Sequence, residues 1–133
     1  MSGQEISEHN SPGGGTIYLN ANGKTVSAVL EDNAAADALK AMLRKGRLTL
    51  SMSDNGGFEK VGYLPHSLPS TPVRLKAMSG DVMLYLDNVL CVFYGHNTWA
   101  YTKIATIVKN DLPKLKECLK GGALQLTLSL EAE

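Results

Sequence analysis

Alternating apolar and polar residues dominate most of the chain and predict β-strands. The first alternating segment, residues 16–30, is interrupted by Asn22-Gly23, two residues that tolerate the positive φ angles of a two-residue hairpin turn. With this pair as the loop, Leu19 faces Val26, and one face of the hairpin is uniformly apolar. The pattern therefore predicts an antiparallel hairpin with a defined register at the start of the fold.

Two segments carry apolar residues at spacings of three and four, which predicts amphipathic helices. The first begins at an N-cap, Asp32 or Asn33, and ends at Gly46. The second spans residues 111–120 and has Pro113 in its first turn, a position that suits proline. The remaining alternating or apolar segments predict six more strands, at residues 47–53, 58–64, 81–86, 89–94, 101–108 and 123–130.

The strands at 81–86 and 89–94 differ from the others because both of their faces are apolar. Asp87-Asn88 is the expected turn, and pairing across it places Leu84 beside Cys91. A hairpin that is buried on both faces must lie between two layers, as where a helix covers the wall of a barrel. We therefore expect a mainly β fold, a closed eight-stranded antiparallel β-barrel with two short helices, and a sandwich is the competing architecture.

Composition and charge limit the possible partners. The chain has 133 residues, which fits a single domain, and we expect a disordered N-terminal arm over residues 1–15 and a barrel domain over residues 16–133. Thirteen basic residues balance thirteen acidic ones, which removes the attraction that dominates binding to nucleic acids and anionic membranes. No segment has the length and apolarity of a membrane span. We expect a soluble, cytoplasmic protein, with an exported form that has lost a leader as the open alternative.

Several chemistries lack the residue spacing that they need. Cys91 and Cys118 are not spaced as a metal or redox pair, and we expect buried thiols rather than a disulfide. There is no nucleophile elbow and no phosphate loop, so no catalytic residue is predicted. His66 and His96 would need carboxylates to complete a metal site. We therefore expect surface or packed histidines, with neither a metal nor a cofactor.

Aromatic and hydrogen-bonding side chains gather in two segments that we expect to be connections between strands. One is the proline-rich stretch that follows residue 64, and the other is residues 94–101. Such side chains combine stacking surface with polar tips, as ligand sites do. They predict a shallow pocket or groove for a peptide or small organic ligand, built from Tyr63, Pro65, His66, Tyr94, His96 and Trp99. Alternatively, Tyr63 and Tyr101 belong to the barrel wall and Trp99 covers one end of the core.

The order of several segments resembles a known family over nearly all of residues 16–131. After the Asn-Gly hairpin and the first helix come the segments LTLSMSDNGGFEKVGYLP, SLP, SGDVMLYLDNVLCVFYG and YTKIATI. Together they are similar to the small bacterial cyclophilin-like domains. The resemblance implies an eight-stranded cyclophilin-type barrel capped by helices. Most members of that family have no established activity, and some similar domains occur joined to flavodoxin-like modules.

The same resemblance leaves three functions open. Cyclophilins isomerise X-Pro bonds with an Arg, a Phe and a Gln from one strand signature, and no segment here matches that signature. Arg47 and Arg74 lack its neighbouring residues, and the only glutamines are Gln4 and Gln125. The chain is therefore expected to be a non-enzymatic module that binds a small ligand or peptide. The alternatives are a divergent peptidyl-prolyl isomerase and an accessory domain for a flavodoxin-like redox partner.

Overall fold

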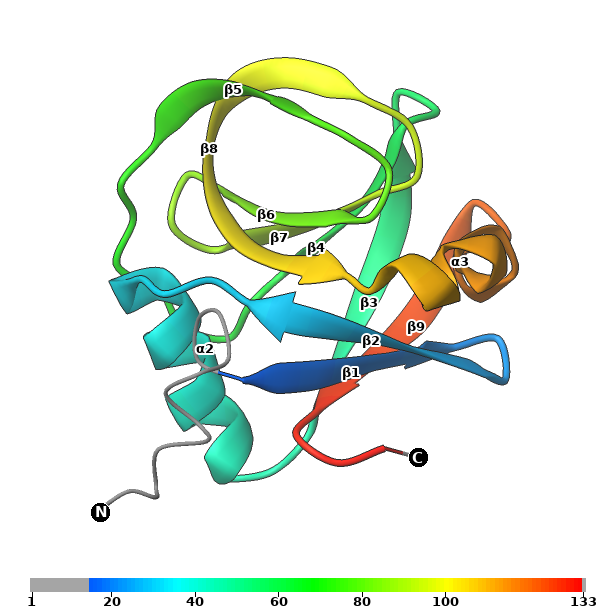
Figure 1. The fold of residues 1–133 in the computed structure, drawn as a ribbon, viewed down its shortest axis with the longest axis horizontal. Coiled ribbons are helices and arrows are strands. Elements are labelled where there is room, and N and C mark those ends of the chain that lie inside the picture. The colour runs from blue at the N-terminus through cyan, green and yellow to red at the C-terminus, as the bar shows by residue number, and fades with distance from the viewer. Residues whose placement is uncertain (1–14, 133) are drawn as a thin grey trace.

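The computed structural model describes residues 15–132, which are mainly β (Figure 1). Apart from Gly15, the predicted N-terminal arm lies outside the described residues. The helices are α2 (Ala34–Arg44) and α3 (Leu112–Cys118), the latter preceded by the 3₁₀ turn η1 (Lys109–Asp111). The strands are β1 (Thr16–Ala21), β2 (Lys24–Leu30), β3 (Leu48–Asn55), β4 (Glu59–Tyr63), β5 (Val73–Ala77), β6 (Asp81–Tyr85), β7 (Val89–Phe93), β8 (Asn97–Ile107) and β9 (Ala123–Ser129).

Eight of these strands form a closed antiparallel ring. Their order is β2-β1-β9-β3-β4-β7-β6-β8, and the pairing of β2 with β8 closes the ring. This arrangement confirms the predicted eight-stranded barrel with two short helices. Alternation directs every second side chain of these strands inward, where they form the main core together with apolar side chains of both helices. Its largest fully buried members are Ile17, Leu19, Leu30, Leu39, Met52, Leu84, Leu90, Ile104, Leu115 and Leu126.

The first hairpin and the first helix form as their residues predict. Asn22 adopts a positive φ of 52° in the turn, and Leu19 pairs with Val26 in the predicted register. Helix α2 begins after Asn33, whose side-chain oxygen accepts a hydrogen bond from the amide of Ala36 at 2.8 Å. The N-cap of this helix is therefore Asn33, one of the two predicted residues.

The hairpin of β6 and β7 has a longer turn than the sequence predicts. Its loop comprises residues 86–88, and Leu86 has a positive φ of 56°, which is uncommon for leucine. The extra loop residue shifts the pairing by one position, so Leu84 lies opposite Leu90 and the predicted pairing of Leu84 with Cys91 is wrong. Both faces of the hairpin are still buried as predicted. Leu90 faces the barrel, whereas Cys91 belongs to a second apolar cluster on the outer face.

The layer that covers this outer face is a pair of strands, not the helix used to explain it from the sequence. The second half of β8 pairs with β6 and closes the ring, whereas residues 97–101 extend beyond it and pair with β5. We call β5 and residues 97–101 the arm; from here on this word refers to these two strand segments and not to the predicted N-terminal arm. In Figure 1 the arm arches over β6 and β7. Two predictions are thereby corrected, since residues 73–77 form a ninth strand and residues 97–101 are a strand instead of a connection.

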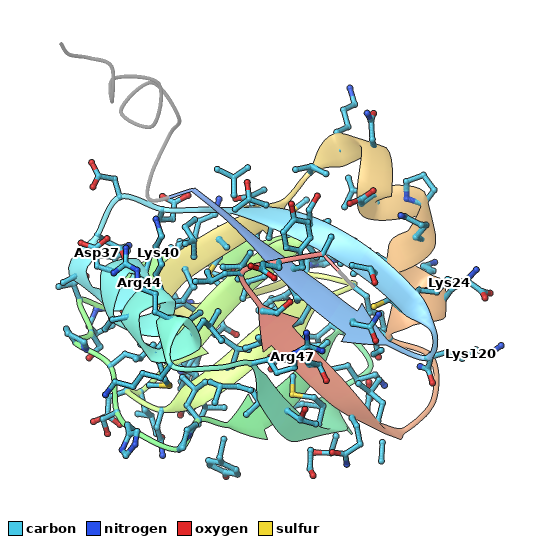
Figure 2. All side chains as sticks on the ribbon, turned by 90° about the horizontal axis from the view of Figure 1, so that it is seen from below. Lys24, Asp37, Lys40, Arg44, Arg47 and Lys120 are labelled. Carbon is cyan, nitrogen blue, oxygen red and sulfur yellow. The ribbon has the colours of Figure 1, made fainter. Side chains whose placement is uncertain are left out.

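Several charged side chains lie at the two ends of this fold. Figure 2 shows Asp37, Lys40 and Arg44 on α2 at one end of the molecule, and Lys24 and Lys120 at the other end. Acidic and basic side chains are therefore mixed on α2, as on a solvated helix face. Within residues 15–132, no helix is both long enough and apolar enough to cross a membrane.

Candidate functional site

A cavity of about 420 Å³ lies between the arm and the outer face of the barrel wall. Side chains alternate along a strand, so every second residue of β4 and of the arm's residues 97–101 faces this space. The floor includes Val89 and Cys91 of β7, and Tyr85 of β6 lines one side. The residues that follow the alternation into the cavity are Glu59, Val61 and Tyr63 from β4 and Asn97, Trp99 and Tyr101 from the arm.

Aromatic rings form much of the surface around the cavity. Tyr101 meets Phe93 edge to face at a centroid distance of 5.5 Å and lies 6.5 Å from Tyr85. The Tyr101 hydroxyl accepts a hydrogen bond from the Asn97 side-chain amide at 2.9 Å, which fixes the ring further. Trp99 differs from these buried groups because 51% of it is exposed. The cavity therefore combines an interior of packed aromatic rings with an accessible indole.

One carboxyl group lies among these apolar side chains. Glu59 is only 4% exposed, and its Oε2 accepts a hydrogen bond from the Asn55 side-chain amide at 2.6 Å. Its Oε1 has no hydrogen-bond partner, and no other buried side-chain oxygen or nitrogen within the described residues is in this state. Burial raises the pKa of Glu59, and the charge of Asp54 also raises it. The hydrogen bond from Asn55 and a weak hydrogen-bonding interaction with the Cys91 thiol lower it. The carboxyl group that lines the cavity thus has one buried oxygen without a hydrogen-bond partner, which is rare in folded proteins.

The two cysteines are free and buried, as predicted. Burial raises the pKa of the Cys91 thiol, and the neighbouring charge of Glu59 raises it further. Burial also raises the pKa of Cys118. A thiol must ionise to act as a nucleophile, so at neutral pH Cys91 contributes to the cavity as a small apolar group.

A separate polar cluster occupies the opposite side of β4. Lys60 forms an ion pair with Asp54 at 3.1 Å, donates to the carbonyl oxygen of Gly121 and lies over the ring of Tyr94 at 5.4 Å. Tyr94 donates its hydroxyl to Asp54, which lowers the pKa of Asp54 and raises that of Tyr94 to about 12. These groups satisfy one another, so the cluster ties β3 and β4 to the turn before β9.

The structure distributes the predicted site residues over three depressions. Tyr63 and Trp99 line the cavity beneath the arm. Pro65 and His66 line a depression beside the end of α2, and Tyr94 lines the polar depression that contains Lys60 on the other side of β4. The proline-rich stretch and residues 94–101 therefore contribute to different surfaces.

His96, the sixth predicted residue, is exposed in the turn before β8. The sequence analysis omitted Glu59, although a signal for it was present. Alternation along β4 places Glu59 on the same face as Tyr63, so the choice of Tyr63 also pointed to Glu59, four residues earlier in the strand. In the same way, Tyr101 shares the face of Trp99 once residues 97–101 are recognised as a strand.

A family model described as the Cyclophilin-like family matches residues 19–130, which is most of the chain. The chain belongs to the Cyclophilin-like family. The resemblance seen in the order of its segments is thereby confirmed, and it agrees with the observed ring of strands. No curated protein matches this cyclophilin-like domain.

The cyclophilin-like domain is also similar to a solved structure described as McbB in complex with tryptophan. The superposition has a TM-score of 0.63 with 18% sequence identity, and it covers 88% of the present chain. It covers only 45% of the McbB chain, so the domain spans less than half the length of that protein. At this identity, the similarity shows a shared fold.

Proposed function

We propose that this cyclophilin-like domain binds a small, largely apolar ligand in the cavity between the arm and the barrel wall. The observation that carries the proposal is the lining itself. A space of about 420 Å³ is surrounded mainly by aromatic and aliphatic side chains with a few polar groups, which is the usual composition of a ligand site. Tyr63 and Trp99 retain their roles as predicted ligand contacts in this proposal.

The exposure of these two aromatic residues supports a ligand at this position. Tyr63 is 73% exposed and Trp99 is 51% exposed, although both are large side chains that gain from burial. A ligand in the cavity would cover part of both rings. McbB, which has a similar fold, is described in complex with tryptophan, and this favours aromatic probes for the first tests.

The other two hypotheses rest on the family resemblance. Among the described residues that line the cavity, none is an arginine or a glutamine, two of the side chains that cyclophilins use for isomerisation. Isomerase activity stays a prediction, and a protease-coupled assay on X-Pro peptides would exclude it if the rates equal those without protein. Association with a flavodoxin-like partner also stays a prediction.

A titration with propylbenzene, a neutral aromatic probe, tests the binding proposal directly. We expect ¹H–¹⁵N NMR shifts to concentrate at amides beside the cavity, including those of Val61, Cys91 and Tyr101. Trp99→Ala should keep its melting temperature within a few degrees and weaken binding about tenfold, which corresponds to about 1.4 kcal/mol. Global unfolding of this variant would instead make Trp99 a structural residue.

Met78→Ala provides the matched control for Trp99→Ala. Met78 follows β5 at the end of the arm and is exposed, but it does not line the cavity. We expect this variant to bind propylbenzene like the wild type. Shifts centred on His66 or Tyr94, or equal losses in both variants, would contradict the proposed location of the site.

A further inference from the structure

We infer that Glu59 makes this cavity selective for amines, with the ammonium group of the ligand paired to the Glu59 carboxylate and its apolar body in the rest of the space. The inference rests on the proposed function, because it names the ligand class of the same cavity. Its basis is one unpaired, buried carboxylate oxygen, the absence of a cationic side chain among the described residues that line the cavity, and the aromatic rings that line it with Glu59.

The position of Glu59 makes a donor necessary. Asn55 holds Oε2 through its amide, which orients the carboxyl group and leaves Oε1 without a donor. The nearby thiol of Cys91 lies 3.8 Å from the carbonyl oxygen of Val89, to which it donates, and thiols are weak donors. A buried polar atom without a partner is rare in folded proteins. A ligand donor placed at Oε1 would complete the hydrogen bonding of this group.

The groups that surround Glu59 favour a positively charged donor over a neutral one. Within the described residues that line the cavity there is no lysine, arginine or histidine. The adjacent Lys60 is on the opposite side of β4, where it is already paired with Asp54. The other titratable groups near the carboxyl are all acids, a type of side chain that supplies no positive charge: Asp54, Tyr85, Cys91 and Tyr101.

The aromatic rings add a second attraction for an ammonium group. Tyr85, Trp99 and Tyr101 line the cavity together with Glu59, and the faces of such rings attract cations. Val61 and Val89 provide the aliphatic surface that an uncharged ligand body requires. An amine with an aromatic or branched aliphatic body therefore matches both the charge and the apolar lining.

Three probes with the same ring and similar chain lengths separate charge from shape. They are 2-phenylethylamine, propylbenzene and 3-phenylpropionate. We expect the wild-type protein to bind the amine about tenfold more tightly than propylbenzene, because a hydrogen bond to an ionised group is strong when it is buried, and to bind the carboxylate most weakly. NMR titrations would measure all three affinities and locate each probe at the cavity.

Glu59→Gln preserves the shape of the side chain and removes its charge. We expect this variant to lose about tenfold in affinity for 2-phenylethylamine and to keep its affinity for propylbenzene within about threefold. Asp87→Asn is the matched control, because it makes the same change of net charge on an exposed residue in the turn between β6 and β7. The control should bind the amine like the wild type.

The outcomes separate the two proposals. If none of the probes binds at the cavity, the proposed function and the amine assignment both fail. If propylbenzene binds, but the amine binds no more tightly and Glu59→Gln changes nothing, the amine assignment alone fails. Equal losses of amine binding in Glu59→Gln and Asp87→Asn would also overturn it, because a general effect of net charge would then account for the preference.

Calorimetry of the wild-type protein provides a test that does not depend on the folding of Glu59→Gln. Burial raises the pKa of Glu59 in the free protein, and a bound ammonium would lower it. Amine binding should therefore release protons over the mildly acidic range in which free Glu59 is partly protonated. Propylbenzene should release none. The titrations would start at about pH 4.5, the ordinary pKa of glutamate, and continue to about pH 8. Equal proton release with both probes over this range would contradict the pairing of the ammonium group with Glu59.

Discussion

The two faces of the wall formed by β4, β7 and β6 come from the same strands but differ in packing and chemistry. On the inner face, Leu84 and Leu90 are fully buried in a core of aliphatic side chains. On the outer face, Cys91 and Phe93 are also buried, but the cavity and the carboxyl group of Glu59 lie beside them. Because alternation separates the faces, one set of strands can hold the fold together and carry a candidate site.

The layers that cover the two faces explain this difference. The inner face is enclosed by the closed ring, in which every strand has two neighbours. The outer face is covered by the arm, and β5 at its edge pairs with β8 and with no other strand of residues 15–132. Arg74 and Lys76 of β5 are exposed, and charges of this kind protect an edge strand from pairing with other chains. A covering layer whose edge strand pairs with a single neighbour leaves space for a cavity, whereas the closed ring around the inner face does not.

Truncation of one side chain on each face should give the largest contrast. Leu90→Ala removes a side chain that is 0% exposed, and we expect it to lower the free energy of unfolding by about 2–5 kcal/mol. Val61→Ala acts on a half-buried residue beside an existing cavity, so the expected cost is about 1 kcal/mol. Urea denaturation measures both values. Similar costs would show that the outer layer is packed as tightly as the core.

Added volume should have a smaller effect, and only where the inner face is full. A Cβ on Gly62 would lie 2.4 Å from Met52 Sδ and 3.0 Å from the carbonyl oxygen of Ser51. We expect Gly62→Ala to cost about 1–3 kcal/mol. Gly122→Ala is the control, because a Cβ there meets nothing within 4 Å. Equal melting temperatures of the two variants would mean that the inner face can accommodate the extra atom.

Most of the barrel could be predicted from the sequence because its strands alternate over several residues. The arm could not. β5 is short and directly follows Pro72. Its half-buried Leu75 and buried Ala77 gain a partner only because β8 extends beyond the ring. The longer turn that begins at Leu86 could not be predicted either, because leucine rarely adopts a positive φ.

The candidate site was only partly predictable for the same reason. Tyr63 and Trp99 were chosen because they are aromatic, and both line the cavity. Glu59 and Cys91 have no unusual spacing, and they become relevant only when the arm covers their face of the wall. The cavity is therefore a product of tertiary pairing, and local sequence patterns contain little information about it.

The smallest expected effect is a pH dependence of stability that arises on the outer face alone. Burial raises the pKa of Glu59 above its ordinary value of 4.5, so the folded protein holds this proton more tightly than the unfolded chain does. As the pH rises above 4.5, the unfolded chain loses the proton first and stability falls until the folded pKa is passed. The contribution of Glu59 to stability is thus complete below pH 4.5 and is lost at higher pH. The loss is about 1.4 kcal/mol for each unit by which the folded pKa exceeds the unfolded one.

Glu59→Gln should remove this decline, which urea unfolding of both proteins between about pH 5 and 8 would show as converging stabilities at low pH. Asp54 and Asp111 do not mask the effect. Hydrogen bonds to Tyr94 and Ser27 lower the pKa values of these two carboxyls, so their stabilisation is lost only as the pH falls below their ordinary value of 3.8. A parallel decline in the wild type and the variant would assign the pH dependence to other groups. The outer face would then lack the uncompensated carboxyl that distinguishes it from the inner one.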